Sequence, residues 1–286
     1  MSVPEVGLFL STTRLSEVDR ALAAAREIGF RTIQFGKLAE RYYSPTGAQE
    51  LARLLNQEGL IASGLCIVYD GESYADLSAV HRTVGLLPTE TVEERVRYSQ
   101  CCIDTAADLG IRLVTFHVGM LPADPDDPGY QRLQRAVDQI ASYAHRREIE
   151  IGLETGQETA EELLALLARL DTPVGINFDG ANFIAYSTAD PIAALAALYP
   201  RVVGVHIKDY AVPTAPGLLS RPAPIGQGAA RVDETIRFLL TAGFPGPLIL
   251  ETYDTVDPLR TIAEARVYVL DRIQRIRADD TGNAVS

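Results

Sequence analysis

Short apolar runs alternate with longer amphipathic stretches along nearly the whole chain. Eight of the runs have the length of a buried parallel strand, which is apolar on both faces because helices cover the sheet. The stretches between them carry the boundary signals of helices. The pattern therefore predicts eight strands, each followed by a helix, with the strands at residues 6–10, 32–36, 61–68, 112–117, 149–154, 174–179, 202–210 and 248–251.

Several helix boundaries can be placed from residues that favour helix ends. Thr91 and Thr159 each precede a glutamate by three residues, which is the spacing of a capping box. Asp190 and Asp257 are each followed by a proline, which suits an N-cap residue and the first helical position. The last helix is expected to end near Arg277.

The alternation of eight strands with eight helical segments is typical of a (β/α)8 TIM barrel rather than an open α/β sheet. No linker-like change in composition interrupts the alternation, so the chain is expected to form one domain. We predict a barrel over residues 1–277 and a flexible, frayed tail over residues 278–286.

Composition and charge narrow the classes of partner. The chain has 26 Lys and Arg against 38 Asp and Glu, a net charge of −12, so its field opposes binding to nucleic acid and to anionic membranes. Its three cysteines are not a disulfide framework. Because neither a signal peptide nor a membrane-spanning run is apparent, we expect a soluble, cytoplasmic protein. The oligomeric state stays open, a homo-oligomer included.

Four of the expected strands end in a polar residue after an otherwise apolar run. These residues are Glu154, Asp179, His206 and Glu251, and the first three lie 25 and 27 residues apart, about one strand and helix each. The active sites of such barrels lie at the carboxyl ends of the strands. Singly, each carboxylate could instead cap a helix or pair with a surface cation, but the four together predict one shared site.

The composition of this set indicates a metal ion. Three converging carboxylates repel one another unless a cation lies between them. Three oxygen donors and one imidazole suit Mn²⁺ best, with Mg²⁺ and Co²⁺ as alternatives. If the four ligands point inward, then Leu153, Phe178, Val205 and Leu250 face the helices, and all of these are apolar as that face requires.

Other polar residues near the strand ends are candidates for contacts with a substrate. His117 ends the fourth strand and is either a substrate contact or a structural histidine. Lys208 follows His206 by two residues and can point the same way, whereas Asp209 is expected to orient or cap. Two long loops, 69–88 and 211–228, are expected to shape the pocket.

Several motifs closely resemble the sugar phosphate isomerase/epimerase family, whose fold is the xylose isomerase-like TIM barrel. They are Asn177-Phe-Asp-Gly-Ala-Asn-Phe183, Asp190-Pro191 and His206-Ile-Lys-Asp209, together with the strand-ending glutamates. The resemblance implies a carbohydrate substrate and one divalent metal ion held by the four ligands. It also implies that Glu154 and Glu251 flank the substrate as acid and base.

One position departs from the pattern of that family. Many epimerases and the AP endonuclease branch have a histidine three residues after the aspartate of the sixth strand, where this chain has Asn182. Asn182 can hydrogen-bond a sugar hydroxyl, but it cannot titrate near neutral pH. The endonuclease branch needs further histidines and aspartates for a three-zinc cluster, and only four histidines are present, so DNA repair is disfavoured.

The predicted activity is a metal-dependent sugar or sugar phosphate isomerase or epimerase. Glu154 or Glu251 would abstract a proton next to a carbonyl, giving a metal-stabilised enediolate. The alternative is a lyase of the same barrel, either an inosose dehydratase or an enzyme that cleaves C-glycosides, which would expel a leaving group instead. A non-catalytic sugar-binding barrel is a third alternative.

Overall fold

The computed structural model describes residues 4–215 and 217–283, and its described strands form one closed, parallel barrel. Each strand pairs with its neighbours in sequence, and the eighth closes the barrel on the first through the pair Leu8 and Leu250. The predicted (β/α)8 fold is therefore confirmed. The strands are β1 (Val6–Phe9), β2 (Thr32–Phe35), β3 (Ile61–Cys66), β4 (Leu113–His117), β5 (Glu150–Glu154), β6 (Gly175–Asp179), β7 (Val202–Ile207) and β8 (Leu248–Leu250).

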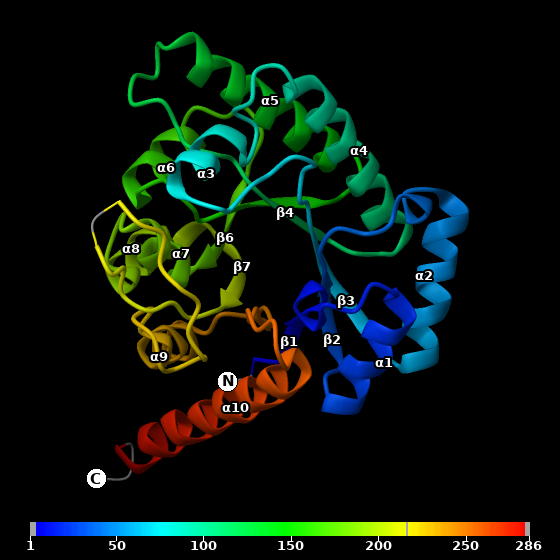
Figure 1. Ribbon diagram of the computed structural model, residues 1–286, viewed down its shortest axis with the longest axis vertical. Helices are drawn as coiled ribbons and strands as arrows, with labels where there is room; N and C mark the ends of the chain where they lie inside the picture. The colour runs from blue at the N-terminus through cyan, green and yellow to red at the C-terminus, as the bar shows by residue number, and fades with distance from the viewer. Residues whose placement is uncertain (1–3, 216, 284–286) are drawn as a thin grey trace.

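Helices form an outer ring around the strands, and the long last helix runs along the outside of the barrel (Figure 1). Three short 3₁₀ helices, at Leu10–Thr13, Glu40–Tyr42 and Tyr199–Arg201, complete the described helical elements. The α-helices are α1 (Val18–Ile28), α2 (Pro45–Glu58), α3 (Leu77–Thr83), α4 (Val92–Asp108), α5 (Pro128–His145), α6 (Ala160–Leu167), α7 (Gly180–Tyr186), α8 (Pro191–Leu198), α9 (Val232–Ala242) and α10 (Pro258–Asn283).

Side-chain caps explain most helix starts, but α1, α4 and α9 begin without one. Thr159 and Glu162 form the predicted capping box at α6. The Asp190 side chain accepts hydrogen bonds from the backbone at the start of α8, as predicted from the proline that follows it. The capping box predicted at Thr91 is wrong, because the Thr91 side chain makes no cap hydrogen bond and donates instead to the carbonyl oxygen of Pro88.

The structure adds two helices and lengthens a third. Helix α3 lies within the predicted loop 69–88, and α7 follows β6 directly, with Asp179 as its N-cap. Helix α10 continues to Asn283, so residues 278–283 of the expected tail are helical. Residues 284–286 lie outside the described part of the chain.

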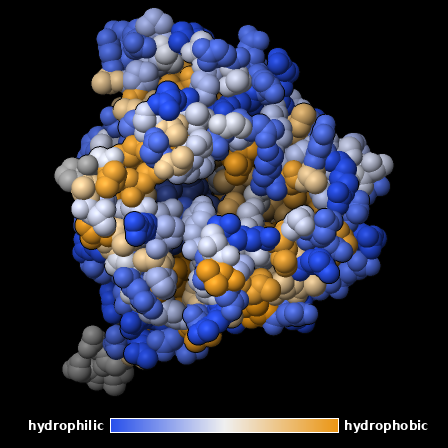
Figure 2. Space-filling model, in the orientation of Figure 1, coloured by the Kyte–Doolittle hydropathy of each residue, from blue (hydrophilic) through white to orange (hydrophobic). Residues whose placement is uncertain are grey.

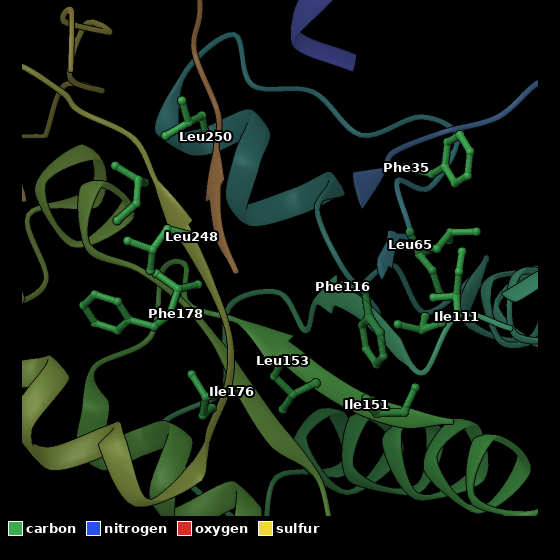
Figure 3. Close-up of a cluster of buried hydrophobic side chains, with 14 of the residues drawn as sticks. Phe35, Leu65, Ile111, Phe116, Ile151, Leu153, Ile176, Phe178, Leu248 and Leu250 are labelled. Atoms are coloured by element: carbon green, nitrogen blue, oxygen red, sulfur yellow. The ribbon is translucent and has the colours of Figure 1, made fainter. Parts of the chain in front are cut away.

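The main core lies between the barrel and the helices (Figure 3). The four residues predicted to face the helices are all fully or almost fully buried there: Leu153, Phe178, Val205 and Leu250. A second, small cluster of Phe9, Cys66 and Ile249 lies on the other side of the strands. Since all strands are parallel, their carboxyl ends meet at one face of the barrel, which is where the polar residues gather.

Candidate metal centre

Four buried side chains converge where β5, β6, β7 and β8 end. Each of Glu154, Asp179, His206 and Glu251 offers one ligand atom, and these atoms all lie within 4.8 Å of one another. None of the four residues is more than 5% exposed. The structure thus brings together the set that the strand ends predicted.

Backbone pairing of the strands fixes the four ligands. Glu154 and Asp179 are the last residues of β5 and β6, and Asp179 lies opposite His206 of β7. Asp179 also caps α7, since its Oδ1 accepts a hydrogen bond of 2.9 Å from the backbone N–H of Ala181. Glu251 follows β8, and its N–H donates to the carbonyl oxygen of Ile207 at 3.0 Å. One carboxylate oxygen of Asp179 is therefore committed to the fold, and the other, Oδ2, makes no hydrogen bond.

The hydrogen bonds of His206 leave one ring nitrogen directed at the carboxylates. Its Nε2 donates to Oε1 of Gln34, so the neutral ring carries its lone pair on Nδ1. That Nδ1 lies 3.0 Å from Oε1 of Glu154 and 3.1 Å from Oε2 of Glu251, all three of them acceptors. The Nδ1 atom of His206 and the Oδ2 atom of Asp179 are both buried, and neither has a hydrogen-bond partner.

Buried acceptors facing one another are unfavourable unless a cation satisfies them. In the metal-free protein a proton can take that place. Burial lowers the pKa of His206, but Glu154 and Glu251 outweigh burial and raise the pKa to about 10. For the Asp179 carboxyl, burial has the opposite effect and raises the pKa to about 6, although Lys208 acts to lower it. A divalent ion would replace this proton, so the residues present fit a metal site.

Lys208 is buried among the ligands rather than at the surface. Its Nζ lies 3.1 Å from Oε1 of Glu251, 3.4 Å from Oδ2 of Asp179 and 3.5 Å from Oδ1 of Asn182. Burial opposes ionisation of Glu251, but Lys208, His206 and Tyr253 together outweigh burial and hold the pKa of Glu251 below its usual range. The hydroxyl of Tyr253 also donates to Oε1 of Glu251 at 2.7 Å.

His117 and Asn182 border the same site. His117 ends β4 opposite Glu154, and burial lowers its pKa, so its ring is neutral near pH 7. Asn182 lies on α7, where its Nδ2 donates to the carbonyl oxygen of Thr155 at 2.8 Å. Its Oδ1 points to Lys208, so the residue that replaces a histidine of the relatives is held by two partners.

A cavity of about 720 Å³ opens above these residues, and six of the seven predicted site residues line it. Only Asp179 is not among the lining residues, because it lies deepest, with 0% exposure. Both long loops contribute to the walls, with Glu72 and Tyr74 from loop 69–88 and Leu219 from loop 211–228. Figure 2 shows the surface hollowed near the middle of the view, with apolar and intermediate residues around the hollow.

Comparisons with known proteins agree with this geometry. Residues 22–272 match a family model described as a xylose isomerase-like TIM barrel. The chain belongs to this family. No curated protein matches the sequence.

Solved structures with the xylose isomerase-like fold cover nearly the whole chain. A xylose isomerase domain protein from Planctomyces limnophilus is 28% identical, with a TM-score of 0.88 over 97% of this chain and 99% of that one. An L-ribulose 3-epimerase is 19% identical, with a TM-score of 0.73 over 99% and 98%. The probable 3-DHS dehydratase AsbF from Bacillus anthracis is 19% identical, with a TM-score of 0.69 over 92% and 98%. The last two similarities show the shared fold.

Two amides that support the ligands of this xylose isomerase-like barrel were not predicted as site residues. Gln34 accepts the hydrogen bond from His206, and Asn177 donates to Oε2 of Glu154. Each amide lies beside a shift in strand register. Opposite Gln34, strand β3 has one extra residue, Ser63, and opposite Asn177, strand β7 has one extra residue, Val203. A polar residue within an apolar strand was the available signal for Gln34.

Asp209 organises the loop that follows β7. Its carboxylate accepts hydrogen bonds from the backbone N–H groups of Gly226, Gly228 and Ala230, at 2.8–3.0 Å. A Cβ at Gly228 would lie 2.2 Å from the Asp209 carboxylate, so this position requires glycine. The role predicted for Asp209 was to orient or cap. In the structure its carboxylate holds the loop after β7, and this loop forms one wall of the cavity.

Proposed function

We propose that this xylose isomerase-like barrel is a divalent-metal-dependent isomerase or epimerase that acts on a carbohydrate. The observation that supports this most strongly is the buried set of three carboxylates and one imidazole, in which Nδ1 of His206 and Oδ2 of Asp179 have no hydrogen-bond partner. Oxygen donors with one nitrogen suit Mn²⁺, Mg²⁺ or Co²⁺, and we consider Mn²⁺ the first candidate.

Glu154, Asp179, His206 and Glu251 would hold the ion. When bound, it would act as a Lewis acid on a carbonyl oxygen of the substrate and so acidify the neighbouring C–H group. Near neutral pH, His117 is uncharged, and it would contact a substrate hydroxyl together with Asn182. Lys208 would hold a substrate oxygen while keeping Glu251 ionised.

The two glutamates would move the proton. Glu251 is ionised beside Lys208, and the hydrogen bond from Tyr253 fixes its carboxylate, so it is present in the unprotonated form in which it would accept a proton. Glu154 is held by Asn177 on a different strand of the barrel. Return of the proton to the opposite face of the same carbon would give an epimer, and return to the adjacent carbon would interconvert an aldose and a ketose.

Solvent exchange tests these roles directly. We expect the Mn²⁺-loaded protein to incorporate deuterium from D₂O into one member of a panel of ketoses and keto-inositols. Glu154→Gln and Glu251→Gln should each slow the exchange by about 10²- to 10⁴-fold, because each removes one proton-transfer group. Glu161→Gln, on the exposed side of α6, is the matched control. Exchange that persists unchanged in either site variant would contradict the assignment.

A lyase is the second candidate, because a probable dehydratase shares the fold. It would begin with the same proton abstraction and then expel a leaving group, as in the inosose dehydratase and C-glycoside-cleaving alternatives. The mass of the product separates the two reactions, since dehydration or cleavage lowers the mass and isomerisation does not. A protein that binds sugar without exchange would instead be a non-catalytic barrel.

Other properties are proposed on separate grounds. Among the described residues, one group of four could hold a metal ion, which does not favour the three-zinc cluster of an AP endonuclease. No helix in the described part of the chain is long and apolar enough to cross a membrane.

The three cysteines are free, which agrees with a reducing cytoplasm, and cell fractionation would test that location. Light scattering would test for a homo-oligomer.

A further inference from the structure

The cavity above the metal centre is larger than a simple sugar requires. Its volume is about 720 Å³, and cavities of about 300 to 1,000 Å³ hold drug-sized ligands. A free hexose displaces roughly six water molecules, or about 200 Å³ at roughly 30 Å³ per water. A monosaccharide at the metal ligands would therefore leave more than half of the cavity to another chemical group.

Burial separates the cavity into a deep polar part and an outer aromatic part. The metal ligands at the base are at most 5% exposed, whereas Tyr74 and Tyr253 are 47% and 46% exposed. Tyr186 and Tyr210 are intermediate. These four residues, here called the tyrosine wall, all line the cavity, and they are joined there by Leu219.

The tyrosine wall stands directly beyond the metal ligands. Nζ of Lys208, which contacts Glu251, lies 4.9 Å from the ring centroid of Tyr253 and 5.6 Å from that of Tyr210. The centroids of these two rings are 6.5 Å apart. A ligand that contacts Lys208 from the opening therefore passes aromatic faces, which favour planar apolar groups, while the hydroxyls can bind polar substituents.

The charges of the outer cavity do not favour a phosphate group. Lys37 is paired with Asp70, and Lys208 with Glu251 and Asp179. Arg14 interacts electrostatically with Asp254, and Glu72 adds a carboxylate to the lining. Both lysines that line the cavity thus have a carboxylate partner, whereas phosphate recognition is favoured by a cluster of unopposed donors.

We propose that the substrate is a sugar that keeps a carbonyl group and also carries an aromatic or similar planar apolar substituent, and that it is not phosphorylated. The sugar binds at the metal ligands, and the substituent lies against the tyrosine wall. This inference rests on the proposed function for the position of the sugar, and it adds the chemical class of the remainder of the substrate.

Equilibrium binding to the full-length, Mn²⁺-loaded protein tests the inference without turnover. The probes are the 4-methylumbelliferyl β-D-glucoside, β-D-galactoside and β-D-xyloside, whose coumarin fluorescence can be followed because the chain contains no tryptophan. The matching free sugars and their terminal phosphates serve as competitors. We expect at least one aryl glycoside to bind about tenfold or more tightly than its free sugar and its phosphate.

Variants of one wall residue identify the part of the cavity that gives this preference. Tyr74→Ala should weaken binding of the aryl glycoside by about tenfold and leave binding of the free sugar unchanged, whereas Tyr74→Phe keeps the ring and should retain the preference. Tyr199→Ala, outside the cavity, is the matched control. Binding of Mn²⁺ by each variant shows that the site is intact.

The outcomes separate this inference from the proposed function. If free sugars or sugar phosphates bind as tightly as every aryl glycoside, or if Tyr74→Ala weakens all ligands equally, the inference is wrong. If the protein gives either of these results but still exchanges deuterium into a ketose, the proposed function stands and only the inference about the aromatic substituent is wrong. Failure to bind Mn²⁺ would instead overturn the proposed function.

Discussion

The two ring nitrogens of His206 face different partners. Gln34 accepts the proton of Nε2, and the carboxylates of Glu154 and Glu251 surround Nδ1. A histidine held in this way presents a lone pair in a fixed direction, and second hydrogen bonds of this type tune metal affinity. Gln34 therefore belongs to the candidate metal centre together with the four proposed ligands.

Replacing Gln34 should weaken metal binding without removing a ligand. Gln34→Leu keeps the volume of the side chain but loses the acceptor for Nε2, so we expect the dissociation constant for Mn²⁺ to rise by about 10- to 100-fold. Isothermal titration calorimetry measures this change, and Gln49→Leu on the exposed face of α2 is the control. Equal affinities in the two variants would show that Gln34 does not orient His206.

Metal binding should release a proton near neutral pH. The carboxylates raise the pKa of His206 to about 10, so its ring is protonated at pH 7 in the metal-free protein, and an ion at Nδ1 must displace that proton. We expect release of about one proton per Mn²⁺ at pH 7, and an affinity that rises as the pH is raised from 7 toward 10. Calorimetry in buffers of different ionisation enthalpy counts the protons, and no release at pH 7 would contradict this arrangement.

The sequence predicted that Glu154, Asp179, His206 and Glu251 lie together, because each ends an apolar run and strand ends in a barrel share one face. It did not predict Gln34 or Asn177 as their partners. Those contacts depend on which residues lie opposite each other in neighbouring strands, and on irregularities beside both amides that shift this register. Periodicity within one strand carries no information about pairing between strands.

Among the elements, loop 69–88 is held in place by a residue of α4. Arg95 is buried, and its guanidinium donates hydrogen bonds to the carbonyl oxygens of Asp70, Thr83 and Gly85. Its Cζ also lies 5.1 Å from the ring centroid of Tyr69. The loop that carries Glu72 and Tyr74 into the cavity is therefore fixed from behind.

Loss of this guanidinium should loosen the loop selectively. Arg95→Met leaves the three carbonyl groups without their charged donor, and we expect a loss of about 3 kcal/mol in the free energy of unfolding. Hydrogen exchange should increase in residues 69–88 more than in the strands. Arg97→Met, on the exposed side of the same helix, is the control. Unchanged exchange in the loop would show that Arg95 does not hold it.

The elements themselves were predictable to different degrees. All eight strands, the capping box at α6 and the N-cap aspartate followed by proline at α8 follow from local chemistry. Helices α3 and α7 do not, because both are single short elements inside segments that read as loops. At Thr91 the capping spacing is present, but the side chain turns to Pro88 instead.

In the molecule as a whole, the order of the strands assembles the candidate site. Glu154, Asp179, His206 and Glu251 lie at the ends of four consecutive paired strands, β5 to β8, and the closed barrel brings Gln34 of β2 against His206 of β7 (Figure 1). The apolar residues between them face the helices and stabilise the scaffold (Figure 3). The fold therefore supplies the stability, and the loops at one face supply the shape of the cavity.

A divalent ion at this face of the barrel would be seen most directly in an anomalous-difference map at the manganese absorption edge, from crystals of the protein grown with Mn²⁺. We expect one strong peak bounded by Glu154, Asp179, His206 and Glu251, with Nδ1 of His206 as the nitrogen ligand. A peak elsewhere, or none at these residues with Mn²⁺ in excess, would contradict it.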